Sequence, residues 1–478
     1  MLSRSNRHAG KPEVMTEQLP PGADTADDEQ ECESPSRQPW PEPRTAWFAV
    51  GVCALATLFA FLDRGIITLL VQPIKTDLEL SDFEISLLLG FAVIVFNAVV
   101  SVPASRFVDI WPRNIIITAG IAVWSAFTAL CGFAHNFWQL FAARMGVGIG
   151  EIVHGPATYS LMADYFPRER LPRAIAFLQI GFIGGLGISL VLGAFVIQML
   201  LDVDDFAIPG TGIVIRNWQM VFIIVGAPGL LVSLLMSTVP EPPRRGRIID
   251  LKKPMPLREV LRYLIKHWRL YAPQFGALAV SGIEASGTRA WQPVFFQRTF
   301  DWSAQKTGLI LGTAFIVAAP FGLWVATWLT EKLARTHNDA NLRVVAIGYS
   351  LSPLFVIIGP LMPNPWLAVV CAALALMIQV GGAVPQNAAL QSVTPNEMRG
   401  QVTALYLFIF AVIGGGIGPS FIALFTDYVI GDEMLLRYAL SVSAVIMLPI
   451  SAWIMWKGVR PYGEAIAAVK VREQYESD

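Results

Sequence analysis

Apolar stretches of about twenty residues recur along most of this 478-residue chain, and they limit its possible folds more than any other feature. A helix of about 20 residues crosses a hydrocarbon layer of roughly 30 Å, and backbone polar groups in lipid must be hydrogen-bonded within the segment. Only 15% of the residues are charged, against about 25% in an average soluble domain. The sequence therefore predicts an all-α membrane protein.

Twelve apolar stretches can be placed, and they form two groups of six. They lie near residues 47–72, 83–104, 114–134, 136–162, 173–200, 217–239, 270–297, 306–330, 342–361, 365–389, 401–426 and 434–456. The predicted organisation is a disordered polar tail (1–44), a six-helix half (45–239), a basic linker (240–269), a second six-helix half (270–457) and a second tail (458–478).

Lysine and arginine are unevenly divided between the connecting loops. The even-numbered connections carry eighteen of them, and the odd-numbered connections carry five. Because loops rich in Lys and Arg stay on the cytoplasmic side, both termini and the linker are predicted to be cytoplasmic. We expect a multi-pass protein of the cell (inner) membrane.

Two glycine-rich runs suggest that the halves arose by duplication. Residues 184–187 read Gly-Gly-Leu-Gly in the fifth span, and residues 415–418 read Gly-Gly-Ile-Gly in the eleventh. Each follows a short loop that contains Pro, Glu and Arg. Two six-helix halves joined by a cytoplasmic linker resemble the layout of major facilitator transporters, which bind substrate near the midplane between the halves.

Six charged residues remain at membrane depth after the loops and tails are subtracted. They are Asp63, Arg64, Arg144, Glu151, Glu284 and Arg289. A charge at the bilayer centre costs several kcal/mol unless it has a partner or faces a water-filled cavity. Three acids and three bases suggest mutual compensation.

Asp63, Arg144 and Glu151 are predicted to form a vertical ladder within the first half. Counting helix rise from the outer ends of their spans puts Asp63 and Arg144 within about 3 Å of the same depth. Glu151 lies two turns further along the helix face of Arg144. Arg144 is therefore expected to pair with either acid. Such a ladder either couples a proton to conformational change or is a static network that fixes helix packing.

Five further residues are candidates for substrate binding. Arg64 needs a partner other than Asp63, or the substrate itself. His154 either joins a proton relay or packs as a satisfied core histidine. Glu284 and Arg289 do not share a helix face well, and Arg289 either binds an anionic headgroup or extends to the outer interface. Gln386 either lines the path or makes interhelical hydrogen bonds.

Four segments resemble the spinster-like branch of the major facilitator superfamily. They are Phe-Leu-Asp-Arg at 61–64, Arg-Met-Gly-Val-Gly-Ile-Gly-Glu at 144–151, Ala-Asp-Tyr-Phe-Pro at 163–167, and the Gly, Trp, Pro and Phe spacing of 287–295. The resemblance implies transport of sphingosine-1-phosphate or lysophospholipids, with proton dependence in some members. It also implies that Asp63, Arg144 and Glu151 are the coupling residues.

The loop between the second and third spans departs from the superfamily pattern Gly-x-x-x-Asp-Arg-x-Gly-Arg. It keeps the acid and the last base as Asp109 and Arg113, but it lacks the glycines. By this resemblance the two residues are expected to form an inner-gate charge network that opens during the transport cycle.

Other functional classes find little support in the sequence. The chain has neither a His-Glu-x-x-His nor a Gly-x-Ser-x-Gly pattern, and it has no phosphate-binding loop of the Gly-Lys-Ser/Thr type. Its formal net charge of −1 argues against nucleic-acid binding, and its four cysteines have no metal-like spacing.

We therefore expect a monomeric secondary transporter, with no enzymatic activity, cofactor or metal. It would move an amphipathic, lipid-like substrate by proton-coupled rocking of its two halves within the bilayer. A proton-coupled transporter of a small organic solute or drug is the alternative.

Overall fold

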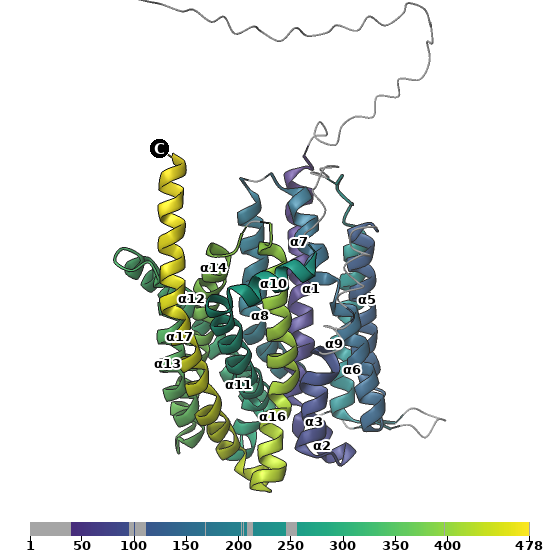
Figure 1. Cartoon of the computed structure of the whole chain (residues 1–478). Helices are drawn as coiled ribbons and strands as arrows, with labels where there is room; N and C mark the ends of the chain where they lie inside the picture. The colour runs from purple at the N-terminus through teal and green to yellow at the C-terminus, as the bar shows by residue number, and fades with distance from the viewer. Residues whose placement is uncertain are drawn as a thin grey trace, which may run out of the picture.

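The computed structural model describes residues 40–94, 100, 111–167, 169–201, 203, 205–207, 214–244, 256–395 and 397–477, and most of them are helical. Figure 1 shows long helices side by side, with the two halves of the chain on opposite sides of the bundle. A two-stranded antiparallel sheet, β1 (Phe206–Ala207) and β2 (Val214–Ile215), lies in the connection after the fifth predicted span. The all-α fold class is confirmed.

Several helices of the first half begin at a polar cap or at proline. The helix bounds in this half are α1 Pro43–Leu69, α2 Val71–Leu78, α3 Asp82–Ser86, the π-helical η1 Leu87–Phe91, α5 Arg113–Cys131, α6 Phe137–Glu151, α7 His154–Tyr165, α8 Leu171–Met199 and α9 Asn217–Ser237. Ser81 accepts a hydrogen bond from Glu84 N at 3.1 Å, and Asn136 accepts one from Gln139 N at 2.9 Å. Such caps satisfy donors that a first helical turn leaves free.

The second half follows a short linker helix and contains several helical segments of unusual winding. The bounds are α10 Leu257–Lys266, α11 Trp268–Phe300, α12 Ala304–Ala334, α13 Ala340–Ile358, η2 Gly359–Leu361, α14 Pro365–Ser392, α15 Arg399–Ile409, η3 Phe410–Ile417, α16 Gly418–Leu424, η4 Phe425–Ile430, η5 Glu433–Leu435 and α17 Leu436–Ser477. The π-helical η3 contains the second glycine run. π segments of this kind are frequent at functional sites.

Nine helices in the described part of the chain are long and apolar enough to cross a membrane. The other three predicted spans each have a reason to fall outside this set. Residues 83–104 are described only as far as 94 and at 100, and residues 136–162 are divided between α6 and α7. The helix over 270–297, α11, has a lower mean hydropathy, because its middle contains two charges together with Ser, Thr and Gly residues. The count of twelve spans stays a prediction.

The two glycine runs both lie where one half meets the other. Gly187 of α8 faces α12 so closely that a Cβ atom there would lie 2.6 Å from the carbonyl oxygen of Gly312. Likewise, a Cβ atom on Gly90 of η1 would lie 2.7 Å from the carbonyl oxygen of Gly415. Only glycine permits these backbone approaches. The repeated runs therefore occupy corresponding places at the interface between the halves.

Helix α17 continues well beyond the predicted end of the last span. It runs without interruption to Ser477, although the span was predicted to end at residue 456 and to be followed by a tail. In Figure 1 it extends past the other helices at the end of the bundle where α1 begins. The described chain thus begins and ends at the same end of the bundle.

Candidate functional site

A buried ion pair joins the first and fourth predicted spans. Arg144 of α6 donates from Nη1 to Asp63 Oδ2 of α1 at 2.7 Å, and the two residues are 1% and 2% exposed. Thr128 of α5 donates to the other oxygen, Asp63 Oδ1, at 2.9 Å. The predicted partnership of Asp63 and Arg144 is present, and both oxygens of the aspartate are hydrogen-bonded.

Glu151 is paired with Arg64, which thereby has the partner other than Asp63 that it was expected to need; that Arg144 also pairs with Glu151 in another conformation stays a prediction. The direction of helical side chains explains the choice, because long side chains lean toward the N-terminus of their own helix. In the predicted orientation, helix α1 runs outward, so Arg64 leans inward toward Glu151. Helix α6 then runs inward, so Arg144 leans outward toward Asp63.

The Arg64–Glu151 pair is the less complete of the two. Glu151 is buried, and its Oε1 atom has no hydrogen-bond partner among the described residues; the same holds for Nε of Arg144. The side chain of Arg64 is 46% exposed. Glu151 therefore depends on one guanidinium that is itself accessible, whereas Asp63 is fixed from two sides.

His154 lies close to this network but packs against other groups. Its Nε2 atom is 3.0 Å from Thr57 Oγ1, and its ring contacts the Trp124 ring edge-on at 5.5 Å between centroids. Its buried Nδ1 atom has no hydrogen-bond partner among the described residues, so His154 is not fully satisfied and both of its predicted roles stay open.

The charges of the second half, Glu284 and Arg289 on α11, are not joined by an ion pair. Glu284 is fully buried and accepts a 2.6 Å hydrogen bond from the Thr288 hydroxyl, while its Oε2 atom has no partner in the described region. Arg289 is exposed and makes no hydrogen bond or ion pair to any described residue. As their spacing of five residues predicted, the two point in different directions.

Gln386 takes part in a hydrogen-bonded chain across three helices of the second half. Ser281 of α11 donates to the Tyr349 hydroxyl of α13 at 3.0 Å, and that hydroxyl donates to Gln386 Oε1 of α14 at 3.2 Å. Gln386 is 4% exposed. This favours an interhelical role over lining a path.

Arg113, predicted to take part in an inner gate, is bound within the first half. It is buried and pairs with Asp164 of α7 and, at 2.7 Å, with Glu241 at the start of the linker. It also donates to the Ser160 carbonyl oxygen at 2.9 Å. Asp109, the other predicted gate residue, lies outside the described residues. The arrangement ties α5 to α7 and to the linker.

Four charged residues that lie outside the predicted spans form a clamp between the halves, here called the outer clamp: Lys75, Asp82, Arg298 and Glu433. Arg298 of α11 makes a bidentate ion pair with Asp82 of α3: Nη1 donates to Oδ2 at 2.6 Å, and Nη2 donates to Oδ1 at 2.7 Å. Lys75 of the first half bonds Asp82 at 2.8 Å and also pairs with Glu433 of the second half. The clamp lies at the end of the bundle that the charge distribution of the loops assigns to the outside.

Asp82 is the centre of the outer clamp and is completely buried. Burial raises its pKa, but hydrogen bonds and charges from Arg298 and Lys75 outweigh that effect, so its pKa lies below the usual aspartate value. The division of charges between loops and spans treated Asp82, Arg298 and Lys75 as loop residues exposed to water. The position of Arg298 in the last turn of an apolar helix was the signal that could have identified it.

Three more hydrogen bonds hold the halves together at the same end. They are Phe83 N to Asp427 Oδ2 (2.7 Å), Ser86 Oγ to Ser420 Oγ (3.0 Å) and Gln297 Nε2 to Leu69 O (3.3 Å). With the outer clamp, they close the interface between the halves at its outer end.

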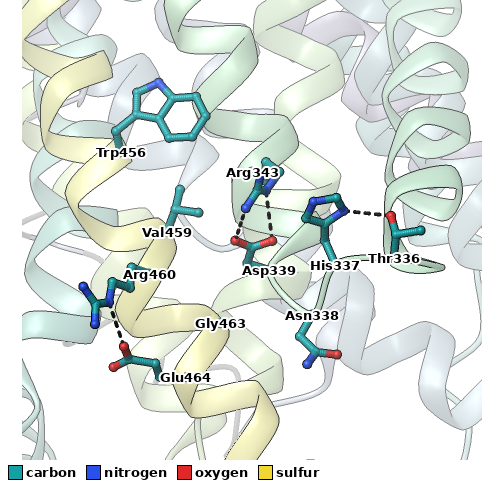
Figure 2. Close-up of a pocket in the computed structure, with 10 residues that line it drawn as sticks. All are labelled: Thr336, His337, Asn338, Asp339, Arg343, Trp456, Val459, Arg460, Gly463 and Glu464. Carbon is teal, nitrogen blue, oxygen red and sulfur yellow. Dashed lines mark hydrogen bonds and ion pairs between the residues drawn. The ribbon is translucent and has the colours of Figure 1, made fainter.

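A hollow of about 540 Å³ lies at the opposite end of the second half, between the α12–α13 connection and α17 (Figure 2). Its two arginines are already occupied, because Arg343 binds Asp339 at 2.8 Å and Arg460 binds Glu464 at 2.9 Å. The hollow does not include the charges at membrane depth. Among the described residues, no group of three or more His, Cys, Asp or Glu side chains is arranged to hold a metal ion.

Comparison with known proteins identifies the family of this chain. The sequence profile of the Major Facilitator Superfamily matches residues 53–419. An MFS-type efflux pump of Mycolicibacterium smegmatis is 27% identical over 82% of this chain and 86% of its own length. A sphingosine-1-phosphate transporter of Xenopus tropicalis is 24% identical over 68% of this chain and 63% of its own length.

A solved structure has the same fold. It is a bacterial homologue of the human lysosomal transporter Spinster in an inward-facing, unoccupied conformation, with a TM-score of 0.71 and 23% identity, and the match covers 89% of this chain and 98% of the other. The resemblance to spinster proteins predicted from sequence motifs is confirmed at the level of fold and relatives.

Proposed function

This chain belongs to the Major Facilitator Superfamily, and from that premise we propose that it is a proton-coupled secondary transporter of an amphipathic, lipid-like substrate. Membership makes it a multi-pass membrane transporter. The two halves would rock about a site near the midplane. The observation that carries the proton-coupling proposal is the pair formed by Arg64 and Glu151, in which a buried carboxylate depends on one accessible guanidinium.

Glu151 is the proposed proton carrier. A carboxylate that loses its only cation at membrane depth is costly in its ionised form, so it binds a proton instead. Separation of Arg64 from Glu151 would therefore be accompanied by proton uptake. Asp63 and Arg144 are also assigned to coupling, as the fixed pair that holds α1 against α6 while Arg64 exchanges partners.

The outer clamp supports alternating access. With the halves joined at their outer end by Arg298, Asp82 and neighbouring contacts, substrate exchange in this conformation would occur from the cytoplasmic side. The opposite state requires these bonds to break, and the backbone contacts between α8 and α12 provide a surface about which the halves can rock.

A lipid-like cargo is supported by the relatives named for sphingosine-1-phosphate transport and by the spinster fold. The alternative, a small organic solute or drug, is supported by the similarity to an efflux pump whose name specifies no lipid. Uptake of a radiolabelled lysophospholipid and of a small carboxylate into proteoliposomes of purified protein distinguishes the two.

Replacing Glu151→Gln tests the coupling. With an inward pH gradient, accumulation of the substrate should fall to the level of empty liposomes, because the amide cannot carry a proton. Exchange of labelled for unlabelled substrate without a gradient should persist. Glu464→Gln, on the exposed surface of α17, is the matched control and should behave as wild type. Gradient-driven uptake with unchanged pH dependence in Glu151→Gln would refute the proposal.

A further inference from the structure

The linker helix α10 (Leu257–Lys266) has a broad apolar face, and one side of that face is packed on the second half. Val260 and Leu264 are the buried side chains of this helix. They belong to a cluster with residues of α11, α14 and α15, namely Tyr271, Leu390, Val402 and Tyr406. In Figure 1, α10 lies across the long helices, toward the end of the bundle where α1 begins. This end is cytoplasmic in the predicted orientation.

The other side of the apolar face is uncovered. Leu257, Leu261 and Ile265 recur every four residues, lie within about 80° of one another around the helix, and are 57%, 40% and 72% exposed. Trp268, the first residue of α11, is 58% exposed. These four side chains are here called the apolar stripe. Single exposed apolar side chains are common on proteins, but an aligned set on so short a helix indicates a contact surface.

Basic side chains border the stripe on the side away from the protein. Arg258, Arg262 and Lys266 also recur every four residues, and helical spacing puts the first of them about 20° beyond Ile265. All three are exposed, and none makes a hydrogen bond or an ion pair with a described residue. Glu259 is the only acid of α10. Around the helix, a buried apolar side is therefore followed by the exposed stripe and then by a basic side.

A helix that extends into water at the same end of the bundle has a different surface. Figure 1 shows the last turns of α17 extending past the other helices. The exposed side chains of α17 between 457 and 470 are mostly charged: Lys457, Arg460, Glu464, Ala468, Val469 and Lys470. In that part of α17, Val469 is the only large apolar side chain that is exposed. Contact with water therefore does not account for the stripe on α10, whereas contact with lipid does.

The length of α11 indicates the level of α10 in the bilayer. Helix α11 has 33 residues, which is about 48 Å at 1.5 Å per residue, close to the roughly 40–45 Å of a bilayer with its headgroup regions. Its last turn contains Arg298 of the outer clamp, so its first residue, Trp268, falls in the opposite headgroup region. Tryptophan is enriched at this level, and α10 ends two residues before Trp268.

We propose that the apolar stripe of α10 inserts between the lipids of the cytoplasmic leaflet, and that Arg258, Arg262 and Lys266 bind the phosphates of anionic lipid headgroups there. A helix that lies in a membrane interface has this arrangement, with apolar side chains among the acyl chains and basic side chains at the headgroups. Because α10 packs on α11, α14 and α15, these lipids anchor the second half of the transporter. The contact does not involve the transported substrate.

Photo-crosslinking of the full-length protein in nanodiscs of phosphatidylcholine and phosphatidylglycerol tests the contact without requiring transport. Benzoylphenylalanine, a photoreactive amino acid, replaces Ile265 in the stripe or, as the matched control, the exposed Glu259 on the far side of α10. Mass spectrometry should find lipid attached at position 265 and none at position 259. Among the lipid adducts, phosphatidylglycerol should be enriched over its share of the disc by about fivefold, the factor that one basic side chain contributes at an anionic surface.

Charge substitutions separate the apolar contact from the recognition of anionic lipid. With Arg258, Arg262 and Lys266 all replaced by Gln, the adducts at position 265 should contain the two lipids in the ratio of the disc. Arg460→Gln, on the exposed surface of α17, should leave the enrichment unchanged. Since the three basic side chains form no bonds with described residues, thermal unfolding of the triple variant should match that of the wild type.

Two outcomes would overturn the proposal. Crosslinking of position 265 to a protein chain, or the absence of lipid adducts there, would show that the stripe faces a protein or water. Lipid adducts without enrichment of phosphatidylglycerol, when all three basic residues are present, would show that α10 does not recognise anionic headgroups. Benzoylphenylalanine at Leu261, the neighbouring position of the stripe, should give the same adducts as at Ile265, and adducts at only one of the two would also contradict insertion of the stripe.

Discussion

The two halves of the molecule treat their membrane-embedded charges in opposite ways. In the first half four charges form two ion pairs, Asp63 with Arg144 and Arg64 with Glu151. In the second half Glu284 has only the Thr288 hydroxyl, and Arg289 has no partner among the described residues. In the first half each of these charges has an oppositely charged partner without a ligand, whereas in the second half neither charge has one among the described residues. This difference suggests that the first half responds to protons and that the second responds to the substrate.

The largest effect is expected from removing a charge in the first half. Arg144→Ala leaves Asp63 buried without a cation, which should destabilise the protein by roughly 3 to 5 kcal/mol and abolish transport. Thermal unfolding in detergent measures the loss. Arg144→Lys should retain more stability because the charge remains, and Asp63→Asn combined with Arg144→Ala should recover part of it. Equal stability of the Ala and Lys variants would show that the pair is not important for the fold.

Breaking the outer clamp should have an intermediate effect, and it should shift conformation more than it unfolds the protein. Asp82→Asn removes the carboxylate that joins Lys75 to Arg298 and should favour outward opening by roughly 1 to 3 kcal/mol. Distances between spin labels at the outer ends of the two halves would report it. Glu79→Gln is the control, because Glu79 is an exposed acid in the same loop and makes no ion pair with a described residue.

The outer clamp should not be the pH sensor. A carboxyl whose pKa is lowered on folding contributes stability above its ordinary pKa of about 4, and this stability is lost only as pH falls through the lowered value. Between pH 5 and 8 the charge of Asp82, the centre of the clamp, is therefore constant. The pH response of the label distances over this range should survive in Asp82→Asn, and its disappearance there would move proton sensing from Glu151 to the clamp.

A smaller effect is expected from Thr128, which fixes the second oxygen of Asp63. Thr128→Val removes a buried hydrogen bond to a charged group and should cost about 1 to 2 kcal/mol. Thr118 lies on the same helix, and its buried hydroxyl has no partner among the described residues, so Thr118→Val should be neutral or stabilising. Matching losses in the two variants would mean that the hydroxyl does not act through Asp63.

The sequence located the charges at membrane depth and predicted one of their two ion pairs. Asp63, Arg144 and Glu151 stood out because an ion in an apolar run has few explanations. Glu151 pairs with Arg64 because side chains on α1 and α6 point in opposite directions along the membrane normal. An estimate of depth from residue position along the helix does not include this direction. The outer clamp was missed because Arg298 and Asp82 lie at helix ends, where a loop charge and a buried charge look alike in sequence.

The smallest expected effect is the strictest test of the comparison. Glu284→Gln replaces a buried carboxyl that has no cation within ion-pair distance among the described residues, so the amide loses no ion pair and can still accept the Thr288 hydrogen bond. The free energy of unfolding should change by no more than about 0.5 kcal/mol, and the pH dependence of transport should be retained. If Glu284→Gln instead removed pH-dependent transport as fully as Glu151→Gln, the second half would carry a proton as well, and the division of roles between the halves would be wrong.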